Sequence, residues 1–271
     1  MFILIKDAAD ARLDPYRDLR EPHLRKRYEH GAGIFVAEGE RVLRHLLRSG
    51  WGVESVLISE QKRAPLESLL EALEAPVLVA PPEVLHATAG FSVHRGVLAI
   101  GRRPAARSVE SLVSGSAFVL AVEGVNDHEN MGALFRNASA FGAQAVLLDP
   151  SCCDPLYRRS VRVSMGAVMD VPFATFGHWP EGLGTIGDAG FTVVALTPSG
   201  DTASDSVHDT SWEKVALLVG AEGDGLTPPA LAASHVRVRI PMVAPADSLN
   251  VATAAAVAMS RLHPAGATPL V

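Results

Sequence analysis

The stretch Glu123-Gly-Val-Asn-Asp-His-Glu-Asn-Met-Gly-Ala-Leu-Phe-Arg-Asn-Ala-Ser-Ala-Phe-Gly142 carries the chain from an apolar predicted strand, through a polar loop, into a predicted helix. Leu134, Ala138 and Phe141 form one apolar stripe on that helix. Arg136 lies about 200° from Leu134 at 100° per residue, so it points away from the buried face. There it either serves a ligand or pairs with an acid of the loop, Glu129 or Asp127. A strand, loop and helix in this order predict an α/β fold with a site beside the loop.

The same alternation continues along the chain. The predicted strands are 34–37, 53–59, 77–80, 97–101, 117–122, 145–148, 191–196 and 215–219, and the predicted helices are 38–49, 66–73, 131–141, 156–164 and 249–262. In the second half the strands are near-continuous apolar runs, which indicates a parallel sheet covered by helices on both faces. The last helix is mostly alanine, so it can approach another helix closely, including one across a dimer interface.

Charge and composition divide the 271 residues into two domains. Residues 1–110 hold 16 basic and 15 acidic side chains, whereas residues 111–271 hold 8 and 15, so the net charge of −6 belongs to the second half. The linker GRRPAARSVESLVSGS, residues 101–116, lacks apolar periodicity. We expect a small α/β domain over 1–110 and a larger one over 111–271. Residues 1–30 form a charged helical extension, in which Arg25-Lys26-Arg27 either contacts phosphate or is a solvated helix face.

Several classes of protein are excluded by composition. No apolar run reaches the roughly 18–20 residues of a membrane helix, and the N-terminus lacks the pattern of a secretion signal. We therefore expect a soluble cytoplasmic protein. The only cysteines, Cys152 and Cys153, are adjacent, which rules out a disulfide scaffold. The ten histidines show no paired metal spacing, so we expect no metal site.

Two further segments have the character of ligand loops. Leu217-Leu-Val-Gly-Ala-Glu-Gly-Asp-Gly-Leu226 runs from a strand into a loop with three glycines, but it matches neither the GxGxxG nor the GK[ST] phosphate motif. Ile240-Pro-Met-Val-Ala-Pro-Ala-Asp-Ser-Leu-Asn-Val-Ala-Thr253 leads into the last helix. Ser248 is expected to cap that helix, and capping would not explain Asn250.

Together the three segments resemble the signature motifs of the SpoU (TrmH) family of S-adenosylmethionine-dependent RNA ribose 2′-O-methyltransferases, in the SPOUT superfamily. The resemblance runs through residues 117–262, as N-x-G-A-x-x-R-x-A-x-A-F-G from Asn130, L-x-x-G-x-E-G-x-G-L from Leu217, and I-P-M with S-L-N-V from Ile240 and Ser248. More weakly, Phe35-Val-Ala-Glu-Gly-Glu-Arg-Val-Leu43 and His94-Arg-Gly-Val-Leu-Ala99 resemble the substrate-binding domain that often precedes this catalytic domain.

The resemblance implies an α/β catalytic domain with a deep C-terminal trefoil knot, which dimerises and builds its active site from both subunits. The implied ligand is S-adenosylmethionine, held by Leu196, Thr197, Gly220, Glu222, Gly223, Ile240, Met242 and Leu249. The implied catalytic group is Asn130, Arg136, Glu222, Ser248 and Asn250. Because a guanidinium rarely gives up its proton, we expect Arg136 to hold phosphate and stabilise the developing alkoxide rather than act as a base.

The expected partner is RNA, with ribosomal RNA favoured over transfer RNA because a separate N-terminal domain is commoner on ribosomal RNA enzymes. Candidate RNA contacts are Arg158, Arg159, Arg162, His94 and Arg95. For the three arginines of the predicted helix 156–164, the alternative interpretation is a helix face exposed to solvent. Two alternatives remain from other classes. The first is a catalytically silent RNA-binding protein, which would have no reason to keep all five catalytic residues. The second is a nicotinamide-dependent oxidoreductase, which would need a GxGxxG motif after a strand, and no predicted strand is followed by one.

Overall fold

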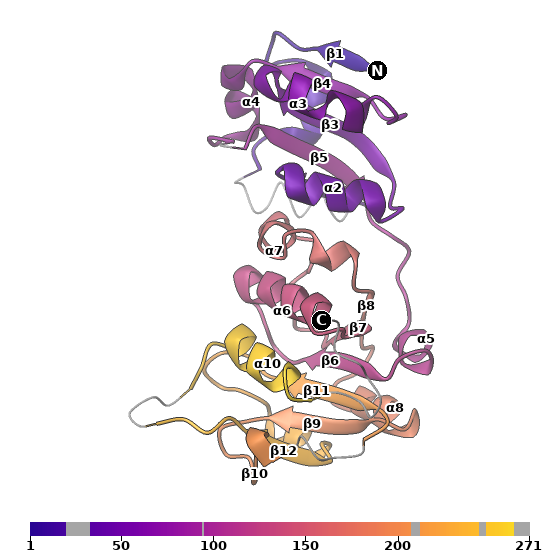
Figure 1. Ribbon diagram of the computed structural model, residues 1–271, viewed down its shortest axis with the longest axis vertical. Coiled ribbons are helices and arrows are strands. Elements are labelled where there is room, and N and C mark those ends of the chain that lie inside the picture. The colour runs from indigo at the N-terminus through magenta and orange to yellow at the C-terminus, as the bar shows by residue number, and fades with distance from the viewer. Residues whose placement is uncertain (20–32, 94, 207–211, 244–247, 263–271) are drawn as a thin grey trace. The chain divides into compact units, whose positions relative to one another are not determined.

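The computed structural model describes residues 1–19, 33–93, 95–206, 212–243 and 248–262, which fall into two compact units. Unit 1 comprises Met1–Ala105 and Leu156–Met169, and unit 2 comprises Ala106–Pro155 and Asp170–Val271 (Figure 1). The chain thus passes from unit 1 to unit 2 after Ala105, five residues before the boundary expected after residue 110. The sequence did not indicate that residues 156–169, inside the second half of the chain, belong to unit 1.

Unit 1 is a five-stranded sheet in the order β1-β4-β3-β5-β2. Its elements are β1 (Phe2–Leu4), η1 (Ala11–Tyr16), β2 (Ile34–Glu38), α2 (Glu40–Arg48), β3 (Val53–Ser59), α3 (Glu60–Leu70), β4 (Val77–Ala80), α4 (Pro82–Ala89), β5 (Val97–Arg102), α7 (Arg158–Val163) and η2 (Ala167–Met169). Neighbours β1, β4 and β3 are parallel, whereas β5 is antiparallel to both β3 and β2. The predicted strands at 53–59 and 77–80 are confirmed, and those at 34–37 and 97–101 each extend by one residue.

The two faces of the unit 1 sheet are covered by different elements. Leu13 and Tyr16 of η1 and Leu85 of α4 join one apolar cluster with alternate residues of the strands. On the opposite face, Gly101 lies against Phe35, and a Cβ at Gly101 would stand 2.5 Å from its ring and 3.2 Å from a methyl group of Leu46 in α2. The charged helical extension expected over residues 1–30 is wrong at its start, where β1 pairs with β4 and only the short η1 is helical; residues 20–32 lie outside the described part of the chain.

The edge strand β2 of unit 1 is covered by α7. All five residues of β2 are buried, and α7 packs against this strand. Glu38, at the end of β2, forms an ion pair with Arg158, whose guanidinium carbon lies 4.4 Å from the centre of the Phe91 ring. Because an open sheet edge is a template for pairing with other chains, this cover protects β2.

Unit 2 is a seven-stranded sheet in the order β10-β12-β9-β11-β6-β7-β8, with every pair parallel. Its elements are α5 (Val109–Ser114), β6 (Phe118–Val122), α6 (His128–Ala140), β7 (Ala145–Leu148), β8 (Phe173–Thr175), α8 (Gly182–Asp188), β9 (Thr192–Leu196), β10 (Thr202–Ala203), η3 (Ser204–Ser206), β11 (Val215–Val219), α9 (Pro228–Ala232), β12 (Val236–Arg239) and α10 (Val251–Met259). The expectation of a parallel α/β sheet in the second half of the chain is confirmed.

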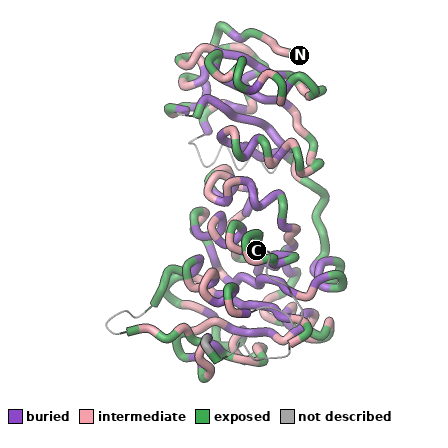
Figure 2. Tube along the Cα trace, in the orientation of Figure 1, coloured by how far each residue is buried: buried purple, intermediate pink, exposed green. Residues whose placement is uncertain are grey.

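Helices cover both faces of the unit 2 sheet, and Figure 2 shows its central strands buried. Apolar residues of α5, α8 and α9 form one cluster with alternate residues of the strands, while α10 packs on α6 and against β9 and β11 on the other face. Coverage on both faces explains why these strands read as continuous apolar runs. The trefoil knot stays a prediction.

The strand order of unit 2 creates a switch point between β6 and β11. From β6 the chain places β7 and then β8 on one side, whereas β9, β11 and β12 lie on the other. Because all strands are parallel, the loops that follow β6, β9, β11 and β12 leave the same edge of the sheet. Open parallel sheets bind ligands at such a point, outside the carboxyl ends of the strands.

Candidate active site

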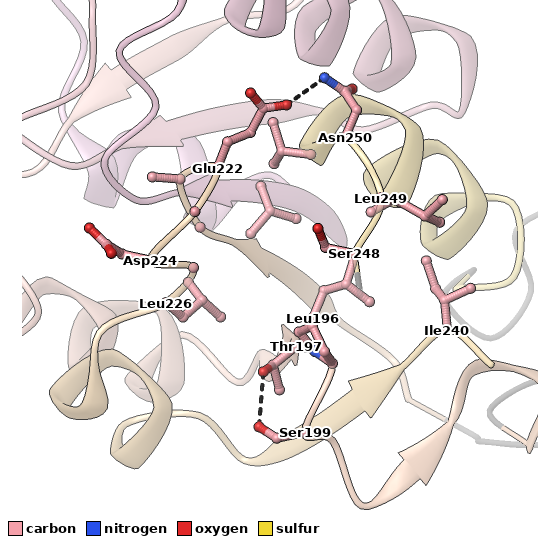
Figure 3. Close-up of a pocket in the computed structure, with 18 of the residues that line it drawn as sticks. Leu196, Thr197, Ser199, Glu222, Asp224, Leu226, Ile240, Ser248, Leu249 and Asn250 are labelled. Atoms are coloured by element: carbon pink, nitrogen blue, oxygen red, sulfur yellow. Dashed lines mark hydrogen bonds between the residues drawn. The ribbon is translucent and has the colours of Figure 1, made fainter. Parts of the chain in front are cut away.

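A cavity of about 640 Å³ lies at this edge of the unit 2 sheet. Three loops line it, which follow β9, β11 and β12 (Figure 3). All eight residues predicted to hold the ligand line the cavity, as do the catalytic candidates Ser248 and Asn250. Sequence reasoning missed ten further lining residues, among them Pro198, Ser199, Asp224 and Leu226. Each of these four follows a predicted strand end, which is the signal that could have found them.

The loop after β11 is folded back tightly on itself. A Cβ at Gly220 would stand 2.4 Å from the carbonyl carbon of Gly225, so a side chain cannot fit there. The backbone N–H of Gly225 donates to the carbonyl of Ala221 at 3.2 Å, and Gly223 and Gly225 have φ of +91° and +70°. These left-handed values favour glycine. The three glycines of the motif thus turn the chain so that Glu222 faces the cavity mouth.

Asn250 joins the loops on the two sides of the cavity. Its Nδ2 donates to Oε1 of Glu222 at 2.6 Å and to Oδ1 of Asn130 at 2.7 Å (Figure 3 shows the first of these bonds). Its Oδ1 accepts from the backbone N–H groups of Ala252 and Thr253 and so caps α10. The expectation that Ser248 caps this helix is therefore wrong: the helix starts at Val251, two residues later than predicted, and Asn250 supplies the cap.

Asn130 is held in place by the start of α6. The Asp127 carboxylate caps this helix by accepting from the backbone N–H groups of Glu129 and Asn130. Asn130 is buried, and about two turns further along α6 the Asn137 amide donates to the carbonyl of Ala252 at 2.7 Å. This bond and the one between Asn250 and Asn130 fix α6 to the start of α10, which orients the two asparagine side chains.

Buried carboxylates support the loops behind the site. Glu123, directly after β6, accepts from the Trp179 indole N–H at 2.6 Å and from the backbone and hydroxyl of Thr227 at 2.8 and 2.7 Å. Asp149, after β7, accepts from the backbone N–H groups of Gly124 and Ser151. These hydrogen bonds connect the loops at the carboxyl edge of the sheet and so help to hold the motif residues in position.

Arg136 is separate from this network. It is exposed on α6, it is not among the residues that line the cavity, and within the described residues it makes no hydrogen bond or ion pair. Pairing with Asp127, one of the two surface alternatives, does not occur, because that carboxylate caps α6 instead. The structure thus brings together Asn130, Glu222, Ser248 and Asn250 and leaves Arg136 free for a partner from outside the chain.

The candidate RNA contacts lie in unit 1. Arg158 is largely buried in its ion pair with Glu38, which neither alternative for this helix anticipated. Nη1 of Arg162 lies 3.8 Å from the same carboxylate, with 41% of its side chain exposed. Arg159 on the same helix and Arg95 are both exposed, while His94 lies outside the described residues.

The cavity fits S-adenosylmethionine in size and charge. Its volume lies within the range of small-molecule sites. The ionisable side chains that line it are Glu222 and Asp224, both acidic, which suits a ligand that carries a sulfonium cation and an ammonium group. No group of three or more His, Cys, Asp or Glu in the described part of the chain could hold a metal ion. Among the described helices, none is both long and apolar enough to cross a membrane.

Fold and site define an α/β enzyme that binds a small cationic cofactor at the carboxyl edge of its parallel sheet. The sequence pattern of the SpoU rRNA Methylase family matches residues 117–260, and the chain belongs to this family. It is 44% identical over 254 residues, 93% of this chain and 88% of the other, to a Mycobacterium bovis protein named an uncharacterized tRNA/rRNA methyltransferase. It is 31% identical over 196 residues, 70% and 78% of the two chains, to the 23S rRNA (guanosine-2′-O-)-methyltransferase RlmB of Burkholderia sp.

Solved structures support the same assignment at the level of the fold. The crystal structure of an AdoMet-bound rRNA methyltransferase from Sinorhizobium meliloti superposes with a TM-score of 0.81 over 96% of this chain and 97% of that one, at 22% identity. The protein is thus an RNA methyltransferase of the SpoU family, and its methyl donor is S-adenosylmethionine.

Proposed function

We propose that the protein methylates a ribose 2′-hydroxyl of ribosomal RNA. The relative from Burkholderia sp bears this activity in its name and aligns with 70% of the chain. A distinct N-terminal unit in front of the catalytic unit also favours ribosomal RNA over transfer RNA.

The observation that carries the proposal is the hydrogen-bonded set of Asn130, Asn250 and Glu222 at the cavity mouth. S-adenosylmethionine supplies a methyl group activated by its positive sulfur, and displacement at that carbon is directional. The chain must therefore hold the ribose hydroxyl in line, and positioning of this kind supplies much of the acceleration. A prearranged set of amides and a carboxylate, with the exposed Ser248 beside it, provides such a holder.

Arg136 completes the site from a second copy of the chain. In this proposal the protein is a homodimer through its catalytic unit, and Arg136 of the partner subunit reaches the cavity mouth. Its exposure and its separation from the cavity of its own subunit support this arrangement. The guanidinium stays charged, holds the phosphate next to the target ribose, and stabilises negative charge as it develops on the 2′-oxygen.

The test is to incubate the full-length protein with S-adenosylmethionine labelled in its methyl group and with separate pools of ribosomal and transfer RNA. We expect label on ribosomal RNA, at a ribose position that resists alkaline cleavage on its 3′ side. Label on a base would contradict 2′-O transfer, and label on transfer RNA alone would contradict the choice of substrate. Bound donor without label on either pool would favour the silent RNA-binding protein.

A further inference from the structure

Helix α2 of unit 1 presents a row of arginines to solvent. Its apolar residues Val42, Leu43 and Leu46 are buried against the sheet. Arg41, Arg44 and Arg48 are exposed on the other side. At 100° per residue Arg41 and Arg48 differ by about 20°, and Arg44 lies about 60° away, so the three share one face. At 1.5 Å per residue the row is about 10 Å long.

More cations gather at the start of this helix. Arg95 lies across Gly39, where a Cβ would stand 3.0 Å from Cδ of the arginine, so the absence of a side chain at Gly39 makes room for it. Glu40, the acid of this region on α2, is shared by Arg44 at 2.9 Å and by Lys62 of α3 at 3.7 Å. One carboxylate thus faces several cations and does not neutralise them.

Helix α7 adds a further arginine to the same region. Glu38 immediately precedes Gly39, and it also contacts two cations, Arg158 and Arg162. Arg158 is buried, whereas Arg162 keeps 41% of its side chain exposed. In the described part of the chain, Arg41, Arg48 and Arg95 have no ion-pair partner. Positive charge in excess of the local carboxylates is costly to maintain unless a negative partner uses it.

We propose that this basic surface binds the phosphate backbone of the RNA substrate. It consists of Arg41, Arg44, Arg48, Lys62, Arg95 and Arg162, so α2, α3, the turn before β5 and α7 all contribute. The inference rests on the proposed function. A row of about 10 Å suits successive phosphates of a polymer better than a single small anion, and arginine forks bind phosphate oxygens in pairs. Phosphate contacts of this kind position an RNA without selecting its sequence.

The experiment compares the full-length protein with the double variant Arg41→Ala/Arg48→Ala. The probe is a fluorescein-labelled fragment of the ribosomal RNA that accepts methyl groups in the assay above, and the measurement is Kd over a series of salt concentrations. Each phosphate contact contributes about 0.7 to 0.9 to the slope of log K against log salt, so the double variant should lose about 1.4 to 1.8. We expect Kd to rise at least about tenfold, with S-adenosylmethionine binding and Tm unchanged.

The matched control removes the same charge from the opposite face of the unit 1 sheet. Arg12→Ala/Arg17→Ala acts on η1, which packs on the face away from α2. This variant should keep the wild-type slope, and Arg41→Lys/Arg48→Lys should keep most of it because the charges remain. Equal losses in the α2 and η1 variants would show that only total charge matters and would overturn the inference. An unchanged slope in the α2 variant, with methyl transfer intact, would overturn it too and leave the proposed function standing. Absence of RNA methylation by the wild type would refute the proposed function instead.

Discussion

Asn250 performs two tasks with one amide group. Its oxygen caps α10, and its nitrogen links Glu222 to Asn130. Asn250→Ala removes both, so we expect the free energy of unfolding to fall by about 1 kcal/mol, from the lost cap, and methyl transfer to be lost. Thermal unfolding and the methylation assay measure the two effects.

Asn250→Ser separates the two tasks, because serine is as good a cap as asparagine but lacks the donating nitrogen. We expect this variant to recover the wild-type Tm and to remain inactive. Recovery of activity together with stability would mean that Asn250 acts only as a cap.

The two cysteines are predicted to be unreactive in the folded protein. Burial raises the pKa of Cys152 and of Cys153 to about 12, and the nearby Asp149 adds to the effect at Cys152. At pH 8 the thiolate fraction should be lower than in the unfolded chain by a factor on the order of 10³. Iodoacetamide should therefore modify the denatured protein quickly and the native protein slowly. Rapid modification of the native protein would contradict this prediction.

The same shift has a consequence for stability. A raised pKa means that the unfolded thiols lose their protons at lower pH than the folded ones, so stability is fully present below the unfolded value of about 8.5. It should decline as the pH rises from there toward 12. Replacement of both cysteines by alanine should remove this part of the decline in a series of unfolding curves.

At the scale of elements, the loop after β11 depends on a glycine that no other residue can replace. Gly220→Ala would force a Cβ against the backbone of Gly225 at 2.4 Å, so the loop must open. We expect this variant to lose S-adenosylmethionine binding in calorimetry, because the lining of the cavity is displaced. Gly223→Ala is the matched control: it has φ of +91° but no atom within 4 Å of a new Cβ, so it should cost about 1–2 kcal/mol and keep measurable binding. Equal binding by both variants would refute the packing argument.

The buried ion pair between β2 and α7 makes a second prediction at this scale. Glu38→Gln leaves the Arg158 charge, of which only 14% is exposed, without its carboxylate. Breaking a buried pair from one side costs about 3–5 kcal/mol, so Tm should fall by several degrees. Glu54→Gln is the control, because its pair with Arg102 joins two exposed side chains and is worth less than about 1 kcal/mol. Similar losses in the two variants would mean that Glu38 does not anchor α7.

At the scale of the whole molecule, the role proposed for Arg136 requires two chains. Arg136→Ala should abolish methyl transfer and leave S-adenosylmethionine binding largely intact. Asn130→Ala should likewise be inactive. If each active site combines Asn130 of one chain with Arg136 of the other, mixed dimers of the two variants contain one intact site, and the mixture should regain up to about a quarter of wild-type activity. No recovery in dimers shown to exchange subunits would contradict a shared site.

The sequence predicted the catalytic half of the molecule well because its signals are local. Apolar runs located β7 and β11 to the residue, and the three motifs follow strands whose parallel order brings them together. Two errors have a physical cause. Ser248 and Asn250 are both good caps, and only the three-dimensional start of α10 decides between them. The return of α7 to unit 1 depends on a pairing with Glu38 far away in the chain, and no local pattern records it.

That pairing has a consequence for how the protein is made. Glu38 and Arg158 are 120 residues apart, and between them the chain contains the rest of the five-stranded sheet and the first two strands of unit 2. At about 5–20 residues per second, a ribosome needs roughly 6 to 24 s to add those residues. During that interval β2 has emerged without its cover, so the nascent chain exposes a bare sheet edge. The vulnerable period for aggregation thus falls in mid-synthesis, and it closes when α7 leaves the exit tunnel.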